Sequence, residues 1–119
     1  MSPEGVLKRA ELDARRSTGK GHHTASVWAD RARPGETREE VIARLLAVTE
    51  LHGLDPARNT HLWWCSSAQK LLAEGFTFEK DEEDGEADEH YSVILGYPPT
   101  LDDAKRFVAA FTKERRPGQ

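Results

Sequence analysis

The apolar residues of this chain fall in short blocks, and the spacing within a block changes along the sequence from two residues to three or four. A spacing of two is typical of a strand, and a spacing near 3.6 is typical of a helix. Turn-forming residues separate the blocks, as at Pro34-Gly35, Gly75 and Pro98-Pro99. Helices and strands must therefore share one hydrophobic core, which predicts an α+β fold.

Apolar alternation and β-rich composition predict four strands, at residues 24–31, 60–65, 76–78 and 91–95. Helices are expected before, between and after them, so the order of elements is (α)-β-α-β-α-β-β-α. Two pairs of residues have the spacing of a helix capping box, namely Thr37 with Glu40 and Ser66 with Gln69. Thr100 and Asp103 are expected to begin the last helix.

A strand, an amphipathic helix and a second strand favour parallel strands joined by a right-handed crossover. The last two strands follow each other without a helix and favour an antiparallel hairpin. We therefore expect one mixed four-stranded sheet with helices packed mainly on one of its faces.

A length of 119 residues is typical of a single domain. We expect a flexible or loosely docked arm at residues 1–21, a layered domain at 22–112 and a basic tail at 113–119. Cys65 is the only cysteine, which excludes an intramolecular disulfide and a zinc site built on several thiolates. We expect no metal and no cofactor. The chain has neither an apolar run of membrane-spanning length nor a leader pattern, so the predicted location is the cytoplasm.

Acidic residues concentrate around the predicted hairpin. Eleven acids and one base occur from Glu74 to Asp103, whereas the net charge of the whole chain is −4. A calcium loop aligned on Gly85 would begin at Lys80 and end at Tyr91, which do not supply the required ligands. The simplest interpretation is a solvated turn, and the functional one is a surface that attracts a basic protein. The acidic residues predicted to bind this partner are Asp81, Glu82, Glu83, Asp84, Glu86 and Asp88.

Trp63 and Trp64 are adjacent, so a strand directs their indoles to opposite faces of the sheet. One indole then packs in the core, while the other, like Trp28, lies on a surface that a helix or a partner covers. Because tryptophan is enriched at binding hot spots, we add Trp28 and Trp63 to the predicted partner-binding residues.

Cys65, Ser66 and Ser67 lie where a predicted strand ends and a helix begins. Backbone amides and the helix dipole favour an anion at such a place and can lower the pKa of a thiol. The candidate catalytic residues are Cys65, Ser66, His61 and His90, with a histidine as the base. The spacings of thiol phosphatases, papain-like proteases and thioredoxin motifs are absent, and a half-buried cysteine beside a capping serine explains the same residues.

The two ends of the chain are basic and could contact a phosphate backbone. No zinc finger, helix-turn-helix or aromatic-interleaved motif accompanies them, and the chain is acidic overall. His22 and His23 would point in opposite directions on an extended segment, which disfavours a shared metal ion.

Three functions follow from these features. The first is a non-enzymatic domain that binds a basic protein through the acidic hairpin. Its alternating elements and acidic surface resemble, by loose analogy and without a shared motif, small bacterial immunity or antitoxin-type proteins, which neutralise basic nucleases. The second is a small enzyme that uses Cys65, Ser66 or Ser67. The third is nucleic-acid binding through the arm and the tail. A homodimer is compatible with all three.

Overall fold

The computed structural model describes residues 1–16, 23–51, 62–80 and 88–115 and contains four helices and five strands within these ranges. The predicted α+β class is confirmed. The elements in chain order are α1 (Pro3–Arg16), β1 (His23–Trp28), α2 (Arg38–Leu51), β2 (Leu62–Cys65), α3 (Ala68–Ala73), β3 (Thr77–Lys80), β4 (His90–Gly96), α4 (Leu101–Ala109) and β5 (Thr112–Arg115).

The strands form two antiparallel sheets. The first sheet has the order β1-β4-β3, and the second pairs β2 with β5. The predicted hairpin of β3 and β4 is present, but the single mixed four-stranded sheet is wrong. β1 and β2 do not pair, so α2 is not a crossover between parallel strands.

The fifth strand explains this difference. Residues Thr112–Arg115 were expected to belong mostly to a basic tail, because Thr-Lys-Glu-Arg has no apolar alternation. They instead pair with β2 along its whole length, with Trp63 opposite Glu114 and Cys65 opposite Thr112. Backbone hydrogen bonding does not require apolar side chains, so this strand carries no periodic signal in the sequence.

The hydrophobic core lies between the β1-β4-β3 sheet and the helices α1, α3 and α4. Val93, at the centre of β4, has no exposed surface and pairs with Ala25 of β1 and Phe78 of β3. Phe76 and Phe107 meet edge to face, with ring centroids 5.8 Å apart. The buried core residues are Ala10, Leu71, Phe76, Val93, Leu95, Phe107 and Ala110.

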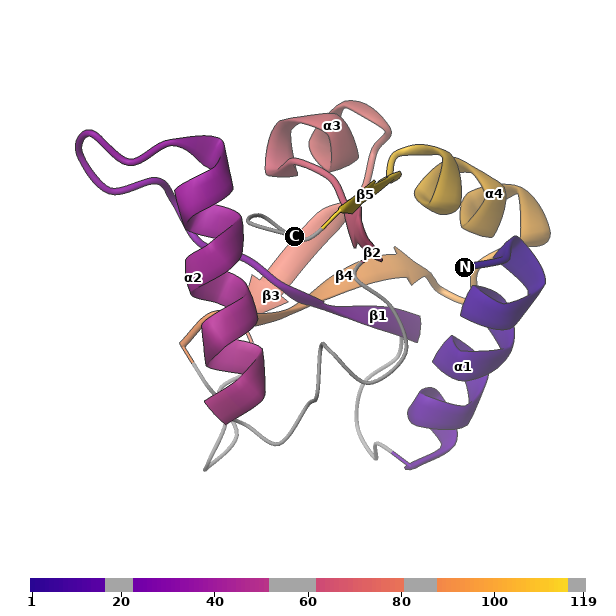
Figure 1. Ribbon diagram of the computed structural model, residues 1–119. Helices are drawn as coiled ribbons and strands as arrows, with labels where there is room; N and C mark the ends of the chain where they lie inside the picture. Colours follow the sequence, from indigo (N-terminus) through magenta and orange to yellow (C-terminus); the bar gives the residue numbers. More distant parts are fainter. Residues whose placement is uncertain (17–22, 52–61, 81–87, 116–119) are drawn as a thin grey trace.

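The N-terminal helix contributes directly to this core. α1 packs against β1 and α4, and Ala10 on its inner face is 1% exposed. Figure 1 shows α1 beside α4 at one side of the molecule and α2 at the opposite side. No residue of α2 belongs to the core cluster that the described residues form. No helix in the described ranges has both the length and the apolar character needed to cross a membrane.

The capping box predicted at Thr37 and Glu40 is present, and a capping box also forms at the helix start predicted at Thr100. At the start of α2 the Glu40 amide donates to Thr37 Oγ1 and the Thr37 amide donates to Glu40 Oε1, both at 3.2 Å. At the start of α4 the same exchange joins Thr100 and Asp103.

The capping box predicted at Ser66 and Gln69 is wrong by one residue. Ser67 is the N-cap of α3, and its Oγ accepts from the Lys70 amide at 3.1 Å. Ser66 instead donates its hydroxyl proton to the carbonyl oxygen of Ala110, 2.7 Å away. This bond joins the start of α3 to the end of α4, a contact that sequence spacing does not reveal.

Adjacent leucines of α3 provide a test of this core. Leu71 is 5% exposed and Leu72 is 54% exposed. We expect Leu71→Ala to lower the free energy of unfolding by about 2–5 kcal/mol, because it removes buried methyl groups and leaves a cavity. Leu72→Ala should change it by less than about 0.5 kcal/mol. Urea denaturation followed by circular dichroism measures both, and equal losses would contradict the placement of α3.

Candidate functional site

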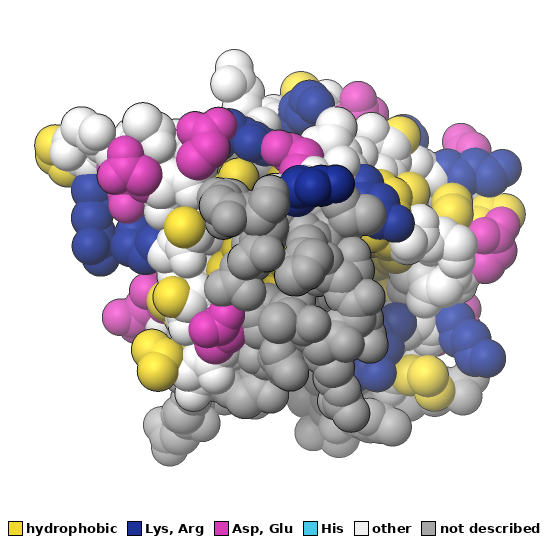
Figure 2. All heavy atoms as spheres, in the orientation of Figure 1, with side chains coloured by type: hydrophobic (Ala, Val, Ile, Leu, Met, Phe, Trp, Pro, Cys, Tyr) yellow, Lys and Arg dark blue, Asp and Glu magenta, His cyan; other side chains and the backbone are white. Residues whose placement is uncertain are grey.

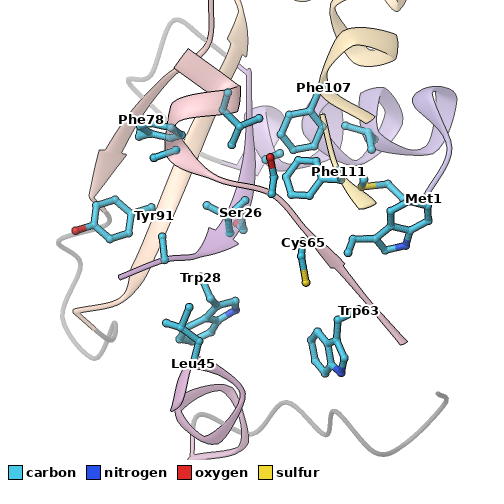
Figure 3. Close-up of a pocket in the computed structure, with 18 of the residues that line it drawn as sticks. Met1, Ser26, Trp28, Leu45, Trp63, Cys65, Phe78, Tyr91, Phe107 and Phe111 are labelled. Carbon is cyan, nitrogen blue, oxygen red and sulfur yellow. The ribbon is translucent and has the colours of Figure 1, made fainter. Parts of the chain in front are cut away.

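A cavity of about 930 Å³ lies between α2, β1, β2 and the adjoining part of the core (Figure 3). Its walls are mainly apolar, and aromatic side chains come from six different elements or connections. The aromatic residues that line it are Trp28, Trp63, Trp64, Phe78, Tyr91, Phe107 and Phe111. The space is partly open at the surface, and it is much larger than the voids inside protein cores.

β2 supplies one wall of the cavity. Trp63 and Cys65 are two residues apart on this strand, so both side chains point to the same face. Figure 3 shows the Cys65 sulfur directed toward the space between Trp28 and Trp63. The Trp63 indole N–H is buried without a hydrogen-bond partner among the described residues, and it points away from Cys65 (Figure 3). The indole therefore presents carbon atoms to the cavity.

α2 supplies the opposite wall through Ile42, Leu45, Leu46 and Thr49. These residues are three or four positions apart and share one face of the helix. The Thr49 hydroxyl is buried and donates to the Leu46 carbonyl oxygen at 2.7 Å. This internal bond satisfies the hydroxyl, so the inner face of α2 presents methyl groups rather than a free donor.

Arg44 attaches α2 to the loop that follows β1. Its guanidinium donates to both carboxylate oxygens of Glu36, at 2.7 and 2.9 Å, and to Asp30 at 2.6 Å. A further bond reaches the carbonyl oxygen of Arg31 at 3.1 Å. We call this set the Arg44 clamp. Figure 2 shows acidic and basic side chains close together over α2 and the preceding loop.

A second ion pair attaches α2 to β5. Arg38 donates to both carboxylate oxygens of Glu114, at 2.6 and 2.7 Å, in a bidentate geometry. Thr112 donates to the same carboxylate at 2.8 Å. The two residues of the pair are 76 positions apart in the sequence, so it fixes α2 relative to the β2-β5 sheet. α2 is thus held by two arginines on its polar side while its apolar side faces the cavity.

The Arg44 clamp and the ion pair of Arg38 with Glu114, which we call the Arg38 clamp, lower the pKa values of their carboxylates. The hydrogen bonds from Arg44 lower the pKa of Glu36 to about 2, and those from Arg38 lower the pKa of Glu114 to about 2. Burial raises the pKa of the Cys65 thiol, and the negative charge of Glu114 adds to this effect. Cys65 is therefore held as a neutral thiol and not as an activated thiolate.

The candidate catalytic residues do not form a catalytic arrangement in the described part of the chain. Cys65 faces the cavity, whereas the Ser66 hydroxyl is engaged with Ala110. His90 lies on β4, where its ring is 5.0 Å from that of Trp28, and it is not among the residues that line the cavity. His61 lies outside the described residues.

The predicted partner-binding residues separate into two groups. Trp28 and Trp63 are partly buried and line the cavity. Trp64 also lines it, but it is 39% exposed and lies under Lys113. Asp88 is exposed and pairs with Lys80 at 3.3 Å. The other predicted acids, Asp81, Glu82, Glu83, Asp84 and Glu86, lie outside the described residues.

Sequence reasoning missed the residues that form the second wall and the clamps. Arg38, Arg44 and Glu114 have no motif that distinguishes them from other surface charges. Their partners come from distant segments, and only the arrangement of elements identifies them.

Comparisons with known proteins give no match: no family model, no curated protein and no solved structure is significantly similar to this chain.

The clamps predict acid sensitivity. The carboxylates of Glu36 and Glu114 ionise near pH 2 in the folded protein and near pH 4.5 when unperturbed. Their contribution to stability is therefore complete above pH 4.5 and is lost as the pH falls from 4.5 toward 2. We expect Glu114→Gln to cost about 1 kcal/mol at pH 7, since the pair is partly exposed, and less at pH 3.

Urea denaturation at both pH values measures this difference. Glu11→Gln, at an exposed position of α1, is the matched control. An equal effect of Glu114→Gln at pH 7 and pH 3 would contradict the ion pair.

Cys65 should react slowly with alkylating reagents. Its raised pKa and partial burial both reduce the concentration of accessible thiolate at neutral pH. We expect iodoacetamide to modify native Cys65 at least about ten-fold more slowly than the same residue in 6 M urea, as measured by intact-mass spectrometry. Faster modification of Cys65 in the native protein than in the unfolded protein would support the enzyme hypothesis.

Proposed function

We propose that this protein binds a small, mainly apolar molecule in the cavity between α2, β1 and β2. The observation that carries this proposal is the size of the cavity together with its aromatic walls. Sites for small molecules typically have volumes of roughly 300–1,000 Å³ and are lined by apolar and aromatic side chains with a few polar groups. The volume of about 930 Å³ lies within that range.

The polar groups near the cavity favour binding over catalysis. The hydroxyls of Ser66 and Thr49 bond to backbone carbonyls, and that of Ser67 caps α3. The Cys65 thiol is held neutral. A nucleophile requires an effective base within hydrogen-bond reach. The group that the Cys65 thiol contacts is the Glu114 carboxylate, which Arg38 and Thr112 already hold and whose pKa is lowered to about 2, so it is a weak base. The groups that looked reactive in the sequence thus have structural roles.

A variant that fills the cavity tests the proposal. Ser26 lines the cavity from β1, so Ser26→Trp should place an indole in the space that a ligand would occupy. We expect the affinity for the uncharged fluorophore N-phenyl-1-naphthylamine to fall at least about ten-fold, as measured by fluorescence titration.

Leu72→Trp is the matched control, because it adds an indole at an exposed position that does not line the cavity. Circular dichroism checks that both variants fold. Unchanged affinity in folded Ser26→Trp, or no binding by the unmodified protein, would remove the cavity from the functional account.

A second candidate function remains the binding of a basic protein through the acidic hairpin. The observation that favours it is the antiparallel pairing of β3 and β4, which carries the acidic segment between two adjacent strand ends. Neutralising Asp81, Glu82, Glu83 and Asp84 together should lower the association rate of such a partner more than it lowers stability, because peripheral charges mainly steer encounter.

A pull-down at low salt, repeated with this quadruple variant, checks that prediction. A basic protein that the unmodified chain retains and the variant loses would support it. Equal retention by both would exclude the hairpin.

A further inference from the structure

We propose that the ligand of the cavity is an uncharged aromatic molecule. This inference rests on the proposed function, because it specifies the chemical class of molecule that the same cavity accepts. Two independent features of the walls carry it. The charged groups at the cavity are already paired or in water, and the apolar surface is unusually rich in rings.

The charged groups near the cavity have partners from the protein itself. Asp30 is paired with Arg44 at 2.6 Å, and Arg9 is paired with Asp13 at 3.3 Å. Arg31 and Met1, which carries the N-terminal ammonium, also line the cavity, but both residues are exposed, so their charges are solvated. A carboxylate or an amine carried into this site would lose its own hydration without gaining a dedicated counter-charge, which is strongly unfavourable. The walls therefore disfavour both anionic and cationic ligands.

Cys65 and Trp63 agree with this conclusion. The thiol is neutral, so the site contains no thiolate that would attract a cation. The Trp63 N–H points away from Cys65, so it offers no donor there to an anion (Figure 3).

An aromatic cage can bind a quaternary ammonium ion through cation–π contacts. The two acids in the lining, Asp13 and Asp30, are already paired with Arg9 and Arg44, so neither can supplement such contacts without breaking an ion pair. A cationic ligand is therefore disfavoured as well.

The aromatic side chains of the walls support the second part of the proposal, namely that the ligand is aromatic. Trp28, Trp63 and Tyr91 line the cavity from three different strands. Rings prefer offset-stacked or edge-to-face contacts with other rings, and these contacts add to the gain from apolar burial alone. An aromatic ligand gains both contributions, whereas a saturated ligand of the same size gains only burial.

Matched probes test the charge selectivity. N-phenyl-1-naphthylamine and 1-anilinonaphthalene-8-sulfonate share one ring system and differ by a sulfonate. We expect the uncharged probe to bind at least about ten-fold more tightly, and 1-naphthyltrimethylammonium to compete poorly with it. Equal or tighter binding of either charged probe would overturn the requirement for an uncharged ligand.

Naphthalene and decalin test the aromatic preference, because decalin is the saturated counterpart of naphthalene. We expect naphthalene to displace N-phenyl-1-naphthylamine at a concentration at least about three-fold lower. Equal displacement by decalin would overturn the aromatic part of the proposal.

Two controls separate failure of this inference from failure of the proposed function. Each probe is also titrated against folded Ser26→Trp, and each is tested for protection of Cys65 from iodoacetamide. If a charged probe or decalin binds well and both controls place it in the cavity, the protein binds small molecules but the ligand class is wrong. If no probe binds, or if folded Ser26→Trp binds the probes as tightly as the unmodified protein does, the proposed function itself is wrong.

Discussion

The burial of Val93 and Leu95 on β4 organises the whole molecule. β4 is the central strand of its sheet, and its inner face is covered by α1, α3 and α4 through Ala10, Leu71 and Phe107. Because three helices already cover this face, α2 buries only Leu46 and Thr49 and contributes no residue to the core cluster. It lies at the other side of the molecule, where its apolar residues line a cavity. The cavity is thus a direct consequence of how the core is completed.

Ion pairs, rather than contacts with the core cluster, hold α2 in place. The Arg44 clamp joins the middle of the helix to the loop after β1, and Arg38 with Glu114 joins its start to β5. Bidentate guanidinium–carboxylate pairs are more directional than apolar contacts, so they fix the position of a helix without filling the space beneath it. This combination leaves an ordered wall facing a large apolar space.

The sequence predicts the local features well and the long-range ones poorly. Thr37 with Glu40 and Thr100 with Asp103 identified two helix starts, because a capping box depends on residues three positions apart. The sheet arrangement was missed because β5, with the polar sequence Thr-Lys-Glu-Arg, has no apolar period and yet pairs with β2. Trp63 and Cys65 were selected from the sequence, but for separate roles. Their convergence with Trp28 and Leu45 depends on packing between distant segments, which one sequence does not reveal.

The same division between core and α2 bears on how the cavity opens. The free energy of a local opening depends on the apolar area that it exposes and on the polar contacts that it breaks. Opening of α2 leaves Val93, Phe107 and the rest of the core cluster untouched, while it exposes the buried Leu46 and Thr49 and breaks partly exposed ion pairs. Such pairs are worth little individually in water. Separation of α2 from β1 and β2 is therefore much less costly than global unfolding, so the fold combines a stable core with an accessible aromatic site.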